Sequence, residues 1–210
     1  MEDTRQKSAS VSNGRMERAK ADPRAIRTRR QLDRAFVELL FRRSYDNIRV
    51  SDITRKAQVG RATYYAHYTS KHDLLRAQFG SIVAPMLVAK EDEPCRVDAT
   101  LLLQHVKTAP RIYVALMGGR DGGGRGASIM RECFEDRLGR MFHPGEDTHH
   151  PGSDLQARVI VRFVASTLFA TIECWLEQGA CESPEQVQAI FSRLVGKGLA
   201  GMEPSPPRVT

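Results

Sequence analysis

Apolar residues recur at three- and four-residue spacing along most of the chain, which is the period of amphipathic helices. The first such segment follows Asp22 and Pro23, residue types that suit the N-cap and the first helical position. We expect this helix to end near Arg43. Its apolar face carries Leu32, Ala35, Phe36, Leu39 and Leu40.

The next two periodic segments are short and lie close together. One runs from Val50 to Ala57 and the other from Arg61 to Tyr68, with Gln58-Val59-Gly60 between them. Two short helices joined by such a turn predict a helix-turn-helix. Ser70 to Asp73 then has the spacing of a capping box, which predicts the start of a fourth helix.

The second short helix has two different faces. Tyr64 and Tyr68 are one turn apart and are expected to face the core, together with Ile53. A step of about 100° per residue places another set of side chains on the opposite face, which is narrow enough for a DNA major groove. An aromatic core with solvated basic edges would explain these two tyrosines but not Tyr65. The outward set is Arg61, Ala62, Tyr65 and Ala66.

The chemistry of this outward face suits DNA. Arg61 can donate two hydrogen bonds to guanine, and Ala62 can contact a thymine methyl group. Lys71 stands at a helix N-terminus, where free N–H groups also favour an anion such as phosphate. Contacts along the phosphate backbone are expected from Thr63, Tyr65, His67 and Lys71.

Positive charge gathers in the same part of the chain. The whole chain has a formal charge of +7, but residues 1–76 hold 18 basic and 9 acidic side chains and the remainder is slightly acidic. Such a basic region favours a polyanionic partner, with nucleic acid as the first interpretation and an anionic membrane surface as its rival. Residues 1–22 are expected to form a disordered basic arm, and residues 204–210 a flexible tail.

The membrane interpretation is the weaker of the two. We find no run of roughly 20 apolar residues that would span a bilayer and no apolar signal-peptide core near the start. A soluble, cytoplasmic protein without a membrane partner is therefore expected. The cysteines lack metal-ligand spacing and are expected to be buried thiols rather than disulfides. They are Cys95, Cys133, Cys174 and Cys181.

Two stretches resemble the DNA-binding domain of the TetR family of bacterial transcriptional regulators: RTRRQLDRAFVELL, and then VSDITRKAQVGRATYYAHYTSKHDLL. The resemblance covers about residues 26–86. It implies an all-α fold, with a three-helix helix-turn-helix DNA-binding domain at residues 23–86 (motif 49–68) and a larger helical effector-binding and dimerisation domain at 87–203. It also implies DNA contacts from Arg49, where the family usually has Ser or Thr, and from Ser51.

The resemblance further implies a function. Residues 154–200, two long apolar helices, would pair with a second copy as a four-helix bundle, although they could instead only close the monomer's own core. The homodimer would then bind double-stranded operator DNA with a near-palindromic sequence and act as a repressor released by a small molecule. A regulator without a ligand, controlled by a protein partner, is the alternative.

The C-terminal helices contain soft and aromatic side chains with a few polar groups, as a ligand cavity requires. We therefore expect a hydrophobic or aromatic effector, although the same residues could form an ordinary core. The expected pocket residues are Met117, Cys133, Phe134, Arg137, Phe163, Thr167 and Glu173.

One glycine-rich segment, residues 118–127, points towards an enzyme instead. Gly122, Gly124 and Ala127 fit the spacing of a dinucleotide-binding fingerprint if IYVALM before them is a strand. The same letters also suit a buried helix, and the glycines would then form a loop between helices. No set of catalytic residues, cofactor or metal site is expected, because the histidines lack ligand spacing. These are His143, His149 and His150.

Overall fold

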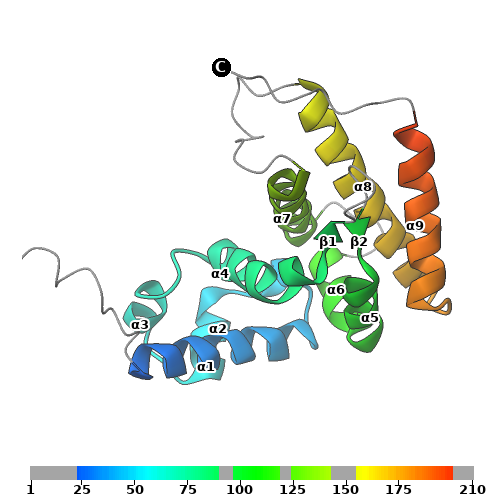
Figure 1. Cartoon of the computed structure of the whole chain (residues 1–210). Helices are drawn as coiled ribbons and strands as arrows, with labels where there is room; N and C mark the ends of the chain where they lie inside the picture. Colours follow the sequence, from blue (N-terminus) through cyan, green and yellow to red (C-terminus); the bar gives the residue numbers. More distant parts are fainter. Residues whose placement is uncertain (1–22, 90–96, 119–123, 143–154, 201–210) are drawn as a thin grey trace, which may run out of the picture.

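The computed structural model describes residues 23–89, 97–118, 124–142 and 155–200, and within them the chain is mostly helical. Figure 1 shows α3 at one end of the molecule and the long helices α8 and α9 at the other. Several expectations fall outside the described residues: the arm at 1–22, the tail at 204–210, Cys95, Gly122, His143, His149 and His150.

The elements of the described residues follow in chain order, with η marking short 3-10 or π turns. They are α1 (Pro23–Leu40), η1 (Tyr45–Asn47), α2 (Val50–Ala57), α3 (Arg61–Tyr65), α4 (Lys71–Gln78), η2 (Phe79–Val83), η3 (Ala84–Met86), β1 (Val88–Ala89), β2 (Val97–Asp98), α5 (Thr100–Thr108), α6 (Pro110–Met117), α7 (Arg125–Phe142), α8 (Leu155–Glu177) and α9 (Pro184–Gly198).

The first three helices form the helix-turn-helix that the spacing predicts. All five apolar positions expected on the core face of α1 are buried. Gln58 ends α2 in the left-handed backbone conformation, with φ of 56°. Helix α3 is shorter than expected because its last turn tightens: the His67 N–H donates to the Tyr64 carbonyl, three residues back, at 2.9 Å. Helix α1 also ends earlier, at Leu40.

Helix α4 leads from this domain into the rest of the molecule. Ser70 caps its start, because its Oγ accepts from the Asp73 N–H at 3.1 Å. The Asp73 carboxylate accepts from the Thr69 N–H at 2.8 Å. The helix then widens into the π turn η2 and tightens into the 3-10 turn η3. The expected domain boundary at residue 86 coincides with the end of η3 and stays a prediction.

The C-terminal helices pack around one apolar core shared with α4. Helix α8 lies between α7 and α9, and α5 packs on α9. A short antiparallel pair, β1 with β2, was not anticipated. Gln188 of α9 fixes it, because its side chain accepts from the Ala99 N–H at 2.9 Å and donates to the Val97 carbonyl at 3.0 Å. Ser183 caps the start of α9, because its Oγ accepts from the Gln186 N–H at 3.2 Å.

The segment before the glycine-rich loop is a helix, α6, so the strand–loop–helix interpretation is wrong. The described glycines have a packing role instead. A Cβ on Gly126 would lie 2.3 Å from the Leu116 carbonyl oxygen and 3.1 Å from the Tyr45 ring. A Cβ on Gly124 would lie 2.8 Å from Asp46 Oδ2. The start of α7 can therefore approach both α6 and η1.

Helix α8 corrects the statement that no run is long enough to span a membrane. By length and composition it could, with a mean hydropathy of 1.7 over its most apolar window. Less than half of that window, 44%, is buried inside the chain. One such helix is weak evidence, because the core helix of a globular protein passes the same test.

The cysteines differ from the expectation of buried thiols. Cys133 is buried in α7, but Cys174 and Cys181 are exposed. All three are free thiols. Cys174 lies on the outer face of α8, a position that an apolar sequence context alone does not separate from the core face.

Candidate nucleic-acid interface

The outward face of α3 is open to solvent. Arg61, Ala62, Thr63 and Ala66 are exposed, and Tyr65 keeps 50% of its surface accessible. Gly60 is the N-cap residue of α3, so no capping side chain covers the start of the helix. The helix end and the side chains of its first turn are therefore available together to a partner.

The opposite face of α3 is anchored through two tyrosines. Tyr64 and Tyr68 are buried, with 0% and 3% of their surfaces exposed. Tyr64 Oη donates to the Ser70 carbonyl at 3.1 Å. Tyr68 Oη donates to Asp33 Oδ1 of α1 at 2.6 Å and accepts from Arg29 Nε at 3.1 Å. Burial raises the pKa of both phenols, so they remain neutral donors.

Two residues that are expected to contact DNA lie at the start of α2. Arg49 is its N-cap residue and its side chain is exposed, while Ser51 is half-buried. The Arg49 N–H donates to Asp52 Oδ2 at 2.9 Å, so the cap is supplied by Asp52 rather than by a hydroxyl at position 49. The guanidinium of Arg49 is therefore not needed to cap the helix.

Lys71 has a different environment from the one its position in the sequence suggests. Its Nζ donates to the carbonyls of Tyr45 and Ile48, both at 2.8 Å, and lies 4.2 Å from the centre of the Tyr45 ring. Burial lowers the pKa of this ammonium group. Lys71 therefore ties the start of α4 to η1. Its expected phosphate contact stays a prediction that depends on its third N–H.

Two histidines, His67 and His72, stand on either side of Lys71 in the sequence. His67 is half-buried, with its ring 6.5 Å from that of Tyr68. His72 Nδ1 lies 2.6 Å from Tyr45 Oη, and burial lowers the pKa of its imidazole. His72 was not among the expected site residues. The contact joins His72 to Tyr45, which are 27 positions apart, so local sequence patterns do not predict it.

The seven expected pocket residues do not converge on one cavity. Met117, Cys133 and Phe134 are buried in the continuous core. Arg137 donates from Nε to the Ala84 carbonyl and from Nη2 to the Leu87 carbonyl, both at 3.0 Å, so it ties α7 to η3. Glu173 is half-buried on α8. Phe163 and Thr167 are the two of the seven that line a common hollow.

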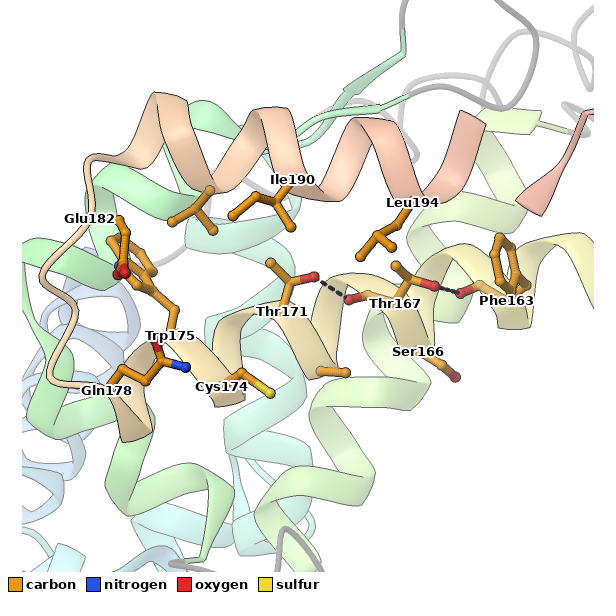
Figure 2. A pocket seen from close by; sticks show the side chains of 12 residues that line it. Phe163, Ser166, Thr167, Thr171, Cys174, Trp175, Gln178, Glu182, Ile190 and Leu194 are labelled. Atoms are coloured by element: carbon orange, nitrogen blue, oxygen red, sulfur yellow. Dashed lines mark hydrogen bonds between the residues drawn. The ribbon is translucent and has the colours of Figure 1, made fainter. Parts of the chain in front are cut away.

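That hollow is a groove of about 790 Å³ on the outer face of α8 and α9. Figure 2 shows Ile190 and Leu194 of α9 above Phe163 and Thr167 of α8. The Thr167 hydroxyl donates to the Phe163 carbonyl at 2.7 Å, so it presents little polarity to the groove. Toward the turn between the helices, Trp175 Nε1 and Glu182 Oε2 are buried without a hydrogen-bond partner among the described residues.

A smaller cavity of about 150 Å³ lies at the junction of α1 with α4 to α7. Its polar members are Gln78, His105 and Tyr113. None of the three was expected at a site. His105 and Tyr113 stand on different helices, on either side of Pro110, so only the packing of α5 against α6 brings them together.

Comparisons with known proteins agree with this architecture. A family model described as bacterial regulatory proteins, tetR family, matches residues 34–77. An uncharacterized HTH-type transcriptional regulator from Bacillus subtilis (strain 168), YxbF, is 41% identical over an alignment of 192 residues that covers 87% of this chain and 48% of that protein. The chain thus spans about half the length of this relative.

Two solved structures share the fold. A TetR transcriptional regulator from Streptococcus agalactiae 2603V superposes with a TM-score of 0.56 at 21% identity, over 82% of this chain and 95% of that one. A TetR transcriptional regulator from Rhodococcus sp. RHA1 gives 0.51 at 16% identity, over 86% and 99%. At these identities the likeness concerns the fold alone.

Proposed function

The chain belongs to the TetR family of helix-turn-helix transcriptional regulators, and from this premise we propose that it binds operator DNA through α3. The family is one of regulators rather than enzymes, so the nucleotide-binding alternative is set aside. The observation that carries the proposal is the division of α3 into an anchored tyrosine face and an open face. The open face begins with Arg61 at the uncapped helix end.

In this proposal the residues of the interface fall into two groups, those that contact bases and those that contact phosphate. Arg61 and Ala62 contact base edges in the major groove, whereas Thr63, Tyr65 and His67 contact phosphate. At the start of α2, Arg49 and Ser51 contact the phosphate backbone on the other side of the groove. The base contacts give sequence preference, and the phosphate contacts give affinity that depends on salt.

The second part of the proposal is a homodimer formed through α8 and α9. Besides Leu155 at the first position of α8, four large apolar side chains are exposed on these two helices, with accessible fractions of 50% for Val159, 36% for Phe163, 40% for Ile190 and 49% for Leu194. A second copy would cover them and the groove between them. A two-fold dimer would place the two α3 helices on half-sites about one helical turn, ~34 Å, or a multiple of it apart.

The third part is release by a small hydrophobic or aromatic effector. To lower operator affinity 100-fold, an effector must bind the DNA-incompetent arrangement better by about 2.7 kcal/mol than the competent one. The chain of contacts from η1 through Lys71 and α4 to Arg137 and α7 supports such coupling, because it joins the two domains without a flexible linker. Control by a protein partner instead of a ligand remains the alternative mechanism.

The experiment is selection of bound duplexes from a random DNA pool with the full chain, followed by measurement of affinity for the enriched sequence. The expected result is a two-fold symmetric motif that is bound more tightly than random DNA. The proposal is rejected if repeated selection enriches no motif. A single unrepeated half-site would support the DNA-binding role and reject the dimer.

A further inference from the structure

The cavity of about 150 Å³ lies where the DNA-binding domain meets the C-terminal domain. It is partly enclosed, and α1, α4, η2, α5, α6 and α7 all contribute to its walls. The lining residues differ from the pocket set expected from the sequence. They are Phe36, Val37, Leu40, Leu75, Gln78, Phe79, Ile82, Val83, His105, Ile112, Tyr113, Leu116 and Met130.

Apart from Gln78, one polar pair stands in these mostly apolar walls. His105 Nδ1 lies 2.6 Å from Tyr113 Oη. Tyr113 is buried, with 2% of its surface exposed, and His105 is half-buried. A buried phenol with one short hydrogen bond still has an oxygen that can take part in a second one. The cavity therefore combines a mostly apolar volume with one place for a polar group.

We propose that this cavity is the effector site and that it takes a compact aromatic molecule with one hydroxyl group, of the size of phenol. Its regulatory meaning rests on the function proposed above. The volume of the cavity sets the size of the ligand, because apolar cavities of about 150 Å³ hold a molecule as large as benzene. A larger or multi-ring compound would exceed this space.

We infer a hydroxyl group on the ligand because the hydrogen bond between His105 and Tyr113 can run in either direction. If Tyr113 donates to His105 Nδ1, the phenol oxygen is free to accept from the ligand. If Nδ1 carries the proton and donates to Tyr113, the phenol hydrogen is free to reach a ligand oxygen. A ligand hydroxyl both donates and accepts, so it satisfies either arrangement. Burial lowers the pKa of His105 and keeps the ring neutral, which favours a neutral ligand over an anion.

The place of the cavity explains how an occupant would reach α3. Phe79, Ile82 and Val83 of the π turn η2 form one wall, and η2 continues α4. At the other end of α4, Lys71 is bonded to η1 of the DNA-binding domain. A molecule that separates η2 and α1 from α6 therefore changes the setting of α4, and with it the setting of α3.

The test uses phenol and toluene as probes, the full chain, and isothermal titration calorimetry. Ile82→Trp adds bulk at the rim of the cavity, and Val37→Phe adds it from α1. Val114→Trp is the matched control, because Val114 is an exposed apolar residue of α6 outside the cavity lining. Tyr113→Phe removes the hydroxyl while keeping the ring. Thermal melting confirms that each variant is folded, and either bulky variant suffices.

Wild type and Val114→Trp should bind phenol with the same affinity. The bulky variants should bind it at least about tenfold more weakly, a difference well resolved by calorimetry. Wild type should prefer phenol to toluene, and Tyr113→Phe should lose this preference. Equal phenol binding by the folded bulky variants and wild type, or no binding by wild type, would overturn the site.

A second measurement separates this proposal from the DNA-binding role. With the DNA sequence selected above, phenol should bind the DNA complex more weakly than the free protein, by the same factor by which phenol weakens DNA binding. Cavity binding without any sequence-specific DNA binding would leave the site standing and reject the proposed function. Specific DNA binding that is unaffected by bound phenol would reject the effector role of the cavity.

Discussion

At the scale of single residues, the adjacent tyrosines of α3 have opposite environments. Tyr64 is fully buried and donates to the Ser70 carbonyl, whereas half of the surface of Tyr65 is exposed. The helical rotation of about 100° between neighbours separates them. The buried tyrosine sets the position of the helix, and this position decides where Arg61 and Tyr65 can reach on DNA.

Arg61→Ala should lower affinity for the selected DNA by about 1–3 kcal/mol and relax preference at one base pair of each half-site. The reason is the loss of a two-donor contact to a base edge. Arg193→Ala is the control, because it removes the same charge from an exposed position on α9. Fluorescence anisotropy on selected and random duplexes measures both variants. An equal loss on the two duplexes would contradict the base-reading role of Arg61.

Two half-buried histidines should make folding stability depend on pH. Burial lowers the pKa of His72 and of His105 below the ordinary value of 6.5, while the unfolded chain keeps that value. Below pH 6.5 the unfolded chain therefore binds more protons than the folded one, and stability falls as pH falls. Urea denaturation between neutral and mildly acidic pH measures the slope. The dependence of the free energy of unfolding on pH should become weaker in the double variant His72→Gln/His105→Gln. An unchanged slope would show that other titrating groups cause the pH dependence.

At the scale of elements, the α6–α7 pair depends on its glycine. Gly126 lets the start of α7 approach the Leu116 carbonyl, and it places Tyr45 of η1 against the same point. The ring of Tyr45 brings the DNA-binding domain to this backbone contact between α6 and α7 of the C-terminal domain. The glycine-rich segment has the spacing of a nucleotide-binding loop. In its described part, however, the glycines allow helices to pack closely.

Gly126→Ala should destabilise the protein by about 1–3 kcal/mol, because the new methyl group overpacks a backbone contact. Gly80→Ala is the matched control in the π turn, where a Cβ meets nothing within 4 Å. Replacing that glycine should be neutral or stabilise by up to about 1 kcal/mol, since alanine has less conformational freedom to lose. Urea unfolding of both variants decides. Two variants of equal stability would show that α6 and α7 can separate without cost.

At the scale of the whole molecule, the proposed interface between copies lies at the end opposite α3 (Figure 1). Leu168 and Phe169 of α8 are buried within one chain and are not available to a second copy. The exposed apolar side chains of α8 and α9 stand on other faces of the same helices. A sequence rich in apolar residues on all sides cannot tell these faces apart, whereas packing against α7 does.

Leu194→Glu should convert the dimer into a monomer, because it places an unpaired carboxylate in the apolar contact. Leu101→Glu on α5 is the control, as both leucines are about half exposed, at 49% and 56%. Sedimentation velocity at micromolar concentration measures the oligomeric state, and circular dichroism checks folding. A wild-type protein that sediments as a monomer would reject the interface.

Local patterns were enough to predict the helix-turn-helix and its outward face. Capping residues, helical spacing and the two buried tyrosines depend on neighbours within a few positions, so Ser70, Tyr64 and Tyr65 behave as expected. The early ends of α1 and α3 are details of the last turn, where hydrogen bonds to the third and fourth preceding residues compete.

The sequence by itself determined the fold class, the core face of each early helix and the residues of α3 that face outward, because these follow from periodicity and from contacts between near neighbours. Only the tertiary structure decided the rest. Lys71 meets Tyr45 and Ile48, and His105 meets Tyr113 in the junction cavity, because helices far apart in the chain pack together. Such contacts depend on the placement of whole elements, and the local pattern carries no record of that placement.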